Sequence, residues 1–180
     1  MLKYFEGWEI IMEHLQSIAQ AVISGNKEKV VKFIKASPSI VNECSEDGWT
    51  PLHLAAYFRQ KEIASFLLES GADIHSRAKN ENENENENEN TPLQAAIANK
   101  QSELVAFLIE KESDVNIMQS GGWTGLHEAA LLGNEEIIML LLKNGANKMI
   151  KKNDGKTAYD IALEKGYNHL LHHLKQEVNL

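Results

Sequence analysis

One short sequence pattern recurs along this 180-residue chain at a nearly constant interval. Thr-Pro-Leu-His-Leu-Ala-Ala begins at Thr50, and related segments begin at Thr91, Thr124 and Thr157. The last two intervals are both 33 residues, whereas the first is 41 residues. A fixed period of about 20–50 residues is typical of repeat proteins, in which each unit buries its apolar face only by stacking on its neighbours. The period therefore favours a stacked array of units.

The long first interval contains an almost pure alternation of Glu and Asn within residues 78–90. Removal of eight residues, which are four Glu-Asn pairs, restores the 33-residue period. We therefore expect residues 81–88 to be an insertion in one loop of a single domain, not a linker between two domains. Glu and Asn have low strand propensity, so a mobile acidic loop is expected. It is either a tolerated surface expansion or an acidic finger that attracts a basic partner.

Each unit carries the signals of two short helices. In residues 50–74, Thr before Pro provides an N-cap followed by a proline at the first helical position. Ile63, Phe66 and Leu67 lie at helical spacing, and Gly71 can end that helix in the left-handed conformation. The sequence therefore predicts two antiparallel helices in each unit, joined to the next unit by a turn-rich segment.

The stretch DGWTPLHLAAYFRQKEIASFLLESGADI resembles an ankyrin repeat, whose period and Thr-Pro-Leu-His-x-Ala signature it matches. The resemblance implies an all-α ankyrin-repeat solenoid of about five helix-turn-helix units with short β-turn fingers. Two departures weaken single helix caps: Glu112-Ser113-Asp114 replaces Gly-Ala-Asp, and Gly125 replaces proline. The expected parts of the single domain 1–180 are an N-terminal capping unit (14–48), a second unit (49–80), the insertion (81–88), a third unit (89–122), a fourth unit (123–155) and a C-terminal capping unit (156–180).

Charge and composition narrow the classes of function. The net charge is −8, and five glutamates of the Glu-Asn tract account for most of it, which leaves −3 on the rest of the chain. This balance predicts neither a nucleic-acid partner nor a membrane partner. The single cysteine, Cys44, excludes an intrachain disulfide framework, and no apolar run reaches the roughly 18 residues of a spanning helix. We expect a cytoplasmic monomer whose translation starts at Met1 or Met12.

The sequence shows no evident catalytic constellation. His-Glu-Ala-Ala-Leu at 127–131 lacks the second histidine of the His-Glu-x-x-His zinc motif. His169 and His173 lie four residues apart, but two ligands make a poor zinc site. We therefore expect no enzyme activity, no cofactor and no metal. A metal-dependent or enzymatic function that uses His169, His172 or His173 is the alternative.

The resemblance implies that a partner protein binds the concave face of the stack, which is made by the finger tips and the ends of the first helices. The second and fourth units place aromatic and aliphatic side chains there, and such residues are typical interface anchors. We predict a non-enzymatic protein–protein interaction module that acts as an adaptor, an inhibitor or an immunity-like regulator. The predicted contact residues are Trp49, Tyr57, Phe58, Asn90, Asn99, Trp123, Leu131, Leu132 and Lys156.

Overall fold

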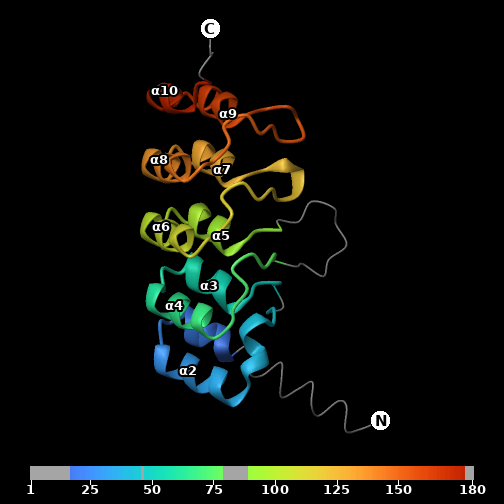
Figure 1. Cartoon of the computed structure of the whole chain (residues 1–180), viewed down its shortest axis with the longest axis vertical. Helices are drawn as coiled ribbons and strands as arrows, with labels where there is room; N and C mark the ends of the chain where they lie inside the picture. The colour runs from blue at the N-terminus through green and yellow to red at the C-terminus, as the bar shows by residue number, and fades with distance from the viewer. Residues whose placement is uncertain (1–16, 46, 79–88, 177–180) are drawn as a thin grey trace, which may run out of the picture.

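A computed structural model of the chain describes residues 17–45, 47–78 and 89–176. These residues form helix pairs that lie one above the other along the long axis of the molecule (Figure 1). The described residues contain helices and turns but no strand. The predicted all-α solenoid is confirmed.

Each central pair consists of a seven-residue first helix and a nine-residue second helix. The pairs are the helical residues 17–23 with α2 (Lys27–Ala36), α3 (Pro51–Tyr57) with α4 (Lys61–Glu69), α5 (Pro92–Ala98) with α6 (Ser102–Glu110), α7 (Gly125–Leu131) with α8 (Glu135–Lys143), and α9 (Ala158–Glu164) with α10 (Leu171–Leu174). The 3₁₀ helices η1 (Pro38–Asn42), η2 (Ser120–Gly122) and η3 (Asn168–Leu170) lie in the connections.

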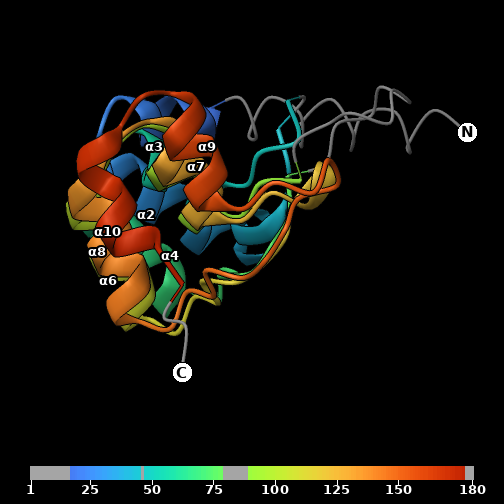
Figure 2. The same ribbon diagram turned by 90° about the horizontal axis from the view of Figure 1, so that it is seen from above.

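Between successive pairs the chain extends to one side of the stack as a finger (Figure 2). Three of these fingers are closed near the tip by a backbone hydrogen bond between residues four apart in the sequence. The hydrogen bonds run from Ser45 N–H to Trp49 O (2.9 Å), from Gln119 N–H to Trp123 O (2.8 Å) and from Lys152 N–H to Lys156 O (3.0 Å). The fingers therefore share one closing geometry.

The finger that precedes α5 is closed in the same way by residues much farther apart. Ala78 N–H donates to Asn90 O at 2.9 Å, and these residues are twelve apart in the sequence, eight more than in the other fingers. Beside them, Arg77 forms an ion pair with Glu89 at 2.6 Å. The predicted insertion, residues 81–88, lies outside the described residues and stays a prediction.

The signature histidine of α3 ties its own unit to the next finger. His53 is fully buried, and its Nδ1 accepts a hydrogen bond from the Thr50 N–H at 3.3 Å. Since Nδ1 accepts, the ring proton is on Nε2, which donates to the backbone oxygen of Asn90 at 2.7 Å. Burial lowers the pKa of His53 from its ordinary value of 6.5 to about 4, so the ring is neutral at physiological pH.

In other units, the residue equivalent to His53 also accepts a hydrogen bond from the N–H of the capping threonine. These residues differ in whether they donate to the next finger. In α5, Gln94 Oε1 accepts from the Thr91 N–H at 2.9 Å, and Nε2 donates to Ile117 O at 3.1 Å. In α9, Asp160 Oδ2 accepts from the Thr157 N–H at 2.8 Å and has no proton to donate. No finger follows α10 in the part of the chain that the structure describes.

His127 in α7 makes only half of this connection. Its Nδ1 accepts from the Thr124 N–H at 3.1 Å. Its Nε2 is buried and makes no hydrogen bond of ordinary geometry among the described residues, although backbone groups of Ile150 and Lys156 lie close enough to act on the pKa of the ring. The connection from the fourth unit to the last finger is therefore weaker than the connection made by His53.

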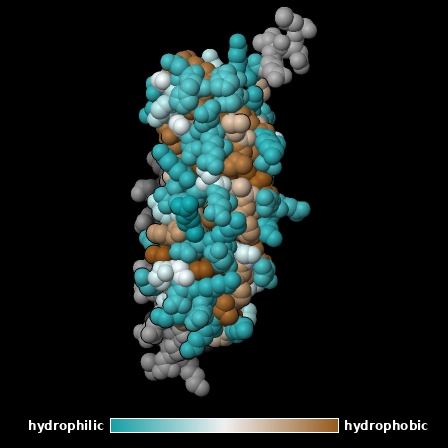
Figure 3. Space-filling model, turned by 90° about the vertical axis from the view of Figure 1, so that its left-hand side faces the viewer, coloured by the Kyte–Doolittle hydropathy of each residue, from teal (hydrophilic) through white to brown (hydrophobic). Residues whose placement is uncertain are grey.

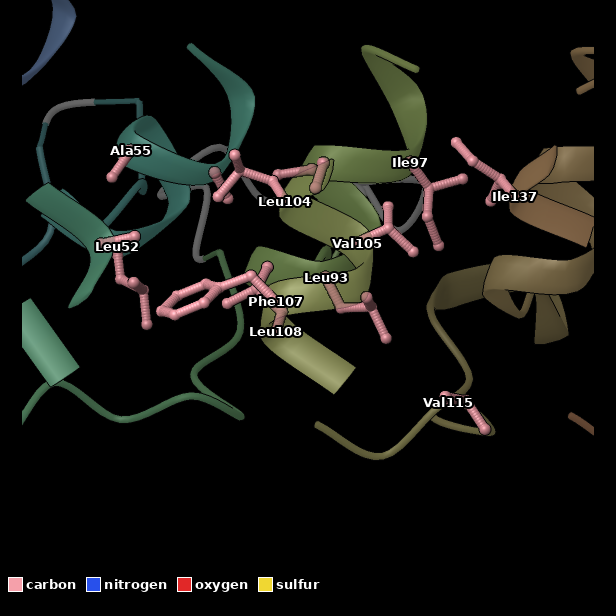
Figure 4. Close-up of a cluster of buried hydrophobic side chains, with 14 of the residues drawn as sticks. Leu52, Ala55, Leu93, Ile97, Leu104, Val105, Phe107, Leu108, Val115 and Ile137 are labelled. Atoms are coloured by element: carbon pink, nitrogen blue, oxygen red, sulfur yellow. The ribbon is translucent and has the colours of Figure 1, made fainter. Parts of the chain in front are cut away.

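The hydrophobic core runs through the stack from one pair to the next (Figure 4). Its buried side chains come from both helices of each pair and fill the layer between neighbouring pairs. Those in the middle of the stack include Leu52, Ala55, Leu93, Ile97, Leu104, Val105, Leu108 and Ile137. Each inner pair therefore contributes to two interfaces, and its stability depends on both neighbours.

Gly125, which replaces the usual proline, is explained by a larger residue in the preceding unit. A Cβ atom on Gly125 would lie 2.7 Å from Cδ1 of Ile97, which is too close for unmoved atoms. Ile97 is fully buried, and the equivalent residues of α3 and α7 are Ala56 and Ala130. The larger side chain of Ile97 in the third unit therefore occupies the space that a Cβ atom at position 125 of the fourth unit would need.

The other departure from the repeat pattern strains the backbone. Glu112 has a φ of +68°, in the left-handed region where Gly71 and Gly145 lie in the neighbouring units. A residue with a Cβ atom is disfavoured there by about 1–2 kcal/mol. The loss of glycine therefore weakens the end of α6 without changing the phase of the repeat.

The contact between Gly125 and Ile97 predicts a strong coupling between the two positions. We expect Gly125→Pro to destabilise the protein, whereas the same change made with Ile97→Ala is neutral or stabilising, because proline is favourable at the first helical position. Ile97→Ala alone costs about 2–5 kcal/mol. The coupling energy from a double-mutant cycle in urea unfolding should reach about 1–3 kcal/mol. Additive effects would contradict this explanation.

The buried His53 predicts that stability falls in acid. As the pH decreases from 6.5 through 4, the unfolded chain binds a proton that the folded chain does not, and this group loses about 3 kcal/mol of stabilisation. His53→Gln should remain folded, since Gln94 makes the same pair of hydrogen bonds. Urea unfolding over this pH range should show a smaller loss for the variant than for the parent. Equal losses would show that His53 is not responsible.

Candidate protein-binding face

The fingers and the first helices meet at an angle along one side of the stack (Figure 2). We call this surface the inner face. It is formed by the finger residues 45, 47–49, 89–90, 119–123 and 152–156 and by the C-terminal ends of α3, α5, α7 and α9. The predicted contact residues lie in or next to these segments.

In the second unit, three aromatic side chains form one row across the inner face. The rings of Trp49 and Tyr57 meet edge to face, with centroids 5.3 Å apart. The rings of Tyr57 and Phe58 do the same at 5.2 Å. Trp49 and Tyr57 are partly buried against the core, and Phe58 is 38% exposed. The row is therefore held in place by its own contacts and still presents an aromatic edge to solvent.

The polar residues predicted in the third unit have structural partners. Asn99 Nδ2 donates to the backbone oxygen of Tyr57 at 2.8 Å and so joins α5 to the end of α3. The backbone oxygen of Asn90 accepts from both His53 and Ala78. Sequence analysis did not assign these connections. The role of Asn90 and Asn99 in binding a partner stays a prediction.

The fourth unit combines an aromatic ring with a cation. Trp123 is partly buried, and the Nζ atom of Lys152 lies 5.0 Å from the centroid of its ring, within the range of a cation–π contact. Leu131 and Leu132 are partly buried against the core at the end of α7. The apolar surface of this unit is therefore smaller than the sequence suggests, because Lys152 covers part of the Trp123 ring.

Lys156, the predicted contact of the last unit, is engaged in ion pairs. Its Nζ atom lies 2.8 Å from Glu164 Oε2 and 4.0 Å from Asp154 Oδ2. The hydrogen bond to Glu164 raises the pKa of Lys156. Exposed pairs of this kind contribute little to stability. Lys156 can therefore exchange these partners for an acidic group at small cost.

Glu128 is a candidate that sequence analysis missed. It lies three and four residues before Leu131 and Leu132 in α7, so the three side chains share one face of the helix. Glu128 is partly buried, and burial raises the pKa of its carboxyl group. No ion pair or side-chain hydrogen bond joins this carboxylate to another described residue. A cation from a partner would compensate for its partial desolvation.

The opposite side of the stack, formed by the second helices, differs in character. Hydrophilic side chains cover most of it, with scattered hydrophobic residues (Figure 3). Polar links join successive second helices: Lys61 with Glu103 (3.0 Å), Ser102 with Glu136 (2.7 Å) and Glu135 with His173 (2.9 Å). We call this surface the outer face. It lacks a row of aromatic anchors like that of the inner face among the residues described.

One group of side chains on the outer face has the composition of a metal site, namely Glu135, His172 and His173. His169, which the sequence pairs with His173, is not part of this group. No helix of the described residues is long and apolar enough to cross a membrane.

Stacked helix pairs with lateral fingers define an α-helical repeat protein. More specifically, the chain belongs to the ankyrin-repeat family: the family model described as "Ankyrin repeats (3 copies)" matches residues 12–78, 78–152 and 112–180. Ankyrin repeats generally mediate protein–protein interactions. The resemblance seen in the sequence is therefore confirmed.

Similar proteins contain much more than this array. Rat ankyrin repeat and SAM domain-containing protein 6 is 40% identical over 74 residues, which are 41% of this chain and 8% of that protein. Alpha-latrotoxin-Lg1a of Latrodectus geometricus is 31% identical over 138 residues, 75% of this chain and 10% of the toxin. Human neurogenic locus notch homolog protein 1 is 28% identical over 173 residues, and the match covers 77% of this chain and 7% of that protein. The chain thus spans about a tenth of the length of these relatives.

The Asn99 contact predicts a stability effect at a position proposed for binding. Asn99→Ala removes the donor to the Tyr57 carbonyl and should lower the free energy of unfolding by about 1 kcal/mol. Asn99→Asp keeps the size of the side chain but places a carboxylate against that carbonyl, so it should cost more than alanine. Urea unfolding of the two variants tests this order. If the aspartate variant were as stable as the parent, the hydrogen bond from Asn99 to Tyr57 would have no role in stability.

Proposed function

We propose that the chain is a non-enzymatic interaction module that binds a partner protein through its inner face and acts as an adaptor, an inhibitor or an immunity-like regulator. The observation that carries the proposal is the row formed by Trp49, Tyr57 and Phe58. Large aromatic side chains that are already fixed lose little conformational freedom on binding, and they are common among the residues that dominate binding energy. Trp123 and Leu132 add apolar surface in the fourth unit.

The inner face also favours a particular chemistry in the partner. Apolar side chains of the partner would pack on the aromatic row, and a lysine or arginine would pair with Glu128. Glu128 lies in the fourth unit, on the same face of α7 as Leu131, and the aromatic row lies two units away in the second unit. We therefore propose a protein segment that carries apolar residues and at least one basic residue. We further propose that the module works as a cytoplasmic monomer without nucleic acid or membrane as a ligand.

The proposal predicts which substitutions abolish binding. The variant with Trp49→Ala, Phe58→Ala and Trp123→Ala should lose a partner that the parent captures from a lysate of the source cell, with mass spectrometry as the readout. The loss of even one anchor of this type costs about 2 kcal/mol or more, so affinity for the identified partner should fall at least about 30-fold. Glu128→Lys should weaken the same complex by charge repulsion.

The matched control is Met139→Ala on the outer face, where the side chain is 52% exposed in α8. It should capture the partner as the parent does. Circular dichroism and urea unfolding establish that each variant is folded. A partner retained by the inner-face variant and lost from the Met139→Ala variant would place binding on the outer face and overturn the proposal.

A further inference from the structure

Three metal-ligating side chains from two different units meet on the outer face. Glu135 is the first residue of α8, and His172 and His173 lie in α10. One ligand atom of each lies within 4.8 Å of the others. We propose that Glu135, His172 and His173 bind a divalent transition-metal ion such as zinc. This proposal is independent of the function proposed for the inner face.

The geometry requires only small side-chain movements. Nε2 of His173 is 2.9 Å from Oε1 of Glu135, and the rings of His172 and His173 have centroids 3.7 Å apart. Ligand atoms around a tetrahedral zinc ion, each about 2.0–2.2 Å from the metal, are about 3.4 Å apart. The separation of 2.9 Å between His173 and Glu135 is shorter than this spacing, and all three ligand atoms lie within 4.8 Å of one another. Glu135 and His172 are exposed, so their side chains can rotate to reach a common ion.

The donor set selects the class of ion. Two imidazole nitrogens and one carboxylate oxygen suit zinc, copper(II) or nickel(II), whereas magnesium and calcium prefer oxygen ligands alone. Three protein ligands leave one tetrahedral position for water. The Glu135 carboxylate already lies beside Nε2 of His173 at 2.9 Å, so two of the three ligand atoms are close together without any metal ion.

His169, which belongs to the alternative considered from the sequence, is not part of this group. His169 lies in η3 and His173 in α10, so a change from 3₁₀ to α-helix separates them. The i and i+4 positions of a 3₁₀ helix do not lie one above the other, because that helix has about three residues per turn. The His169 ring instead contacts Tyr167, with centroids 6.2 Å apart. The third ligand comes from Glu135, which is 37 residues before His172.

A metal ion at this position would connect the fourth unit to the last. It would join α8 to α10 on the outer face, across the same interface where His127 makes the weaker connection on the inner side. Binding to the folded state alone stabilises that state. Zinc should therefore raise the temperature of unfolding and slow hydrogen exchange in α10.

The test uses the full chain without a histidine tag, freed of metal with EDTA and dialysed. Titration calorimetry with zinc chloride should show one zinc ion per chain, and magnesium chloride should show no binding. Glu135→Gln and His173→Ala should each weaken zinc binding at least about tenfold, or about 1.4 kcal/mol. His169→Ala is the matched control, because it removes a neighbouring imidazole outside the group, and its affinity should stay close to that of the parent.

Thermal unfolding provides a second readout. Zinc should raise the unfolding temperature of the parent and of His169→Ala but not that of Glu135→Gln, whose side chain keeps its size and hydrogen-bonding capacity. The proposal is overturned if the parent shows neither saturable zinc binding nor a thermal shift. It is also overturned if Glu135→Gln and His173→Ala bind zinc as the parent does, or if His169→Ala loses as much affinity as they do.

Discussion

The structure depends on a buried hydrogen bond that links the helix of one unit to the backbone of the next. His53 accepts from the start of its own helix and donates to the Asn90 carbonyl, so one neutral ring fixes both the helix start and the position of the following finger. Gln94 repeats this link one unit later. Because the finger tips form part of the inner face, the placement of Trp123 at its surface depends on the link from Gln94 to the finger before α7. Binding geometry is therefore a consequence of how the units are connected.

Much of the fold could be predicted from the sequence because its determinants are local. Thr50 caps α3, and Gly71 follows the end of α4, as the pattern around each Thr-Pro indicates. Contacts between units could not be predicted in this way. Ile97 and Gly125 are 28 residues apart, and only the stack shows that they compete for the same volume. The role of Asn99 was missed for the same reason, since its partner is a backbone carbonyl of the preceding unit.

Successive units are joined by different kinds of interaction on the two faces of the stack. The inner side uses buried hydrogen bonds and close packing, which hold the aromatic row in one arrangement. The outer side uses exposed polar links such as Lys61 with Glu103, which are weak individually and screened by salt. The sequence indicated the aromatic character of the inner face but not its edge-to-face contacts. It also did not indicate Glu128, whose importance follows from partial burial and not from any motif.

The hydrogen bond between Ala78 and Asn90 closes the base of a finger and so marks the boundary between the packed stack and the finger tip. Everything on the helix side of that bond must keep its register, because neighbouring pairs pack against it. We propose that chain beyond the bond adds length without changing the phase of either neighbour. A finger tip of this kind is a place where evolution, or a protein engineer, can lengthen and diversify a repeat protein without redesigning its core.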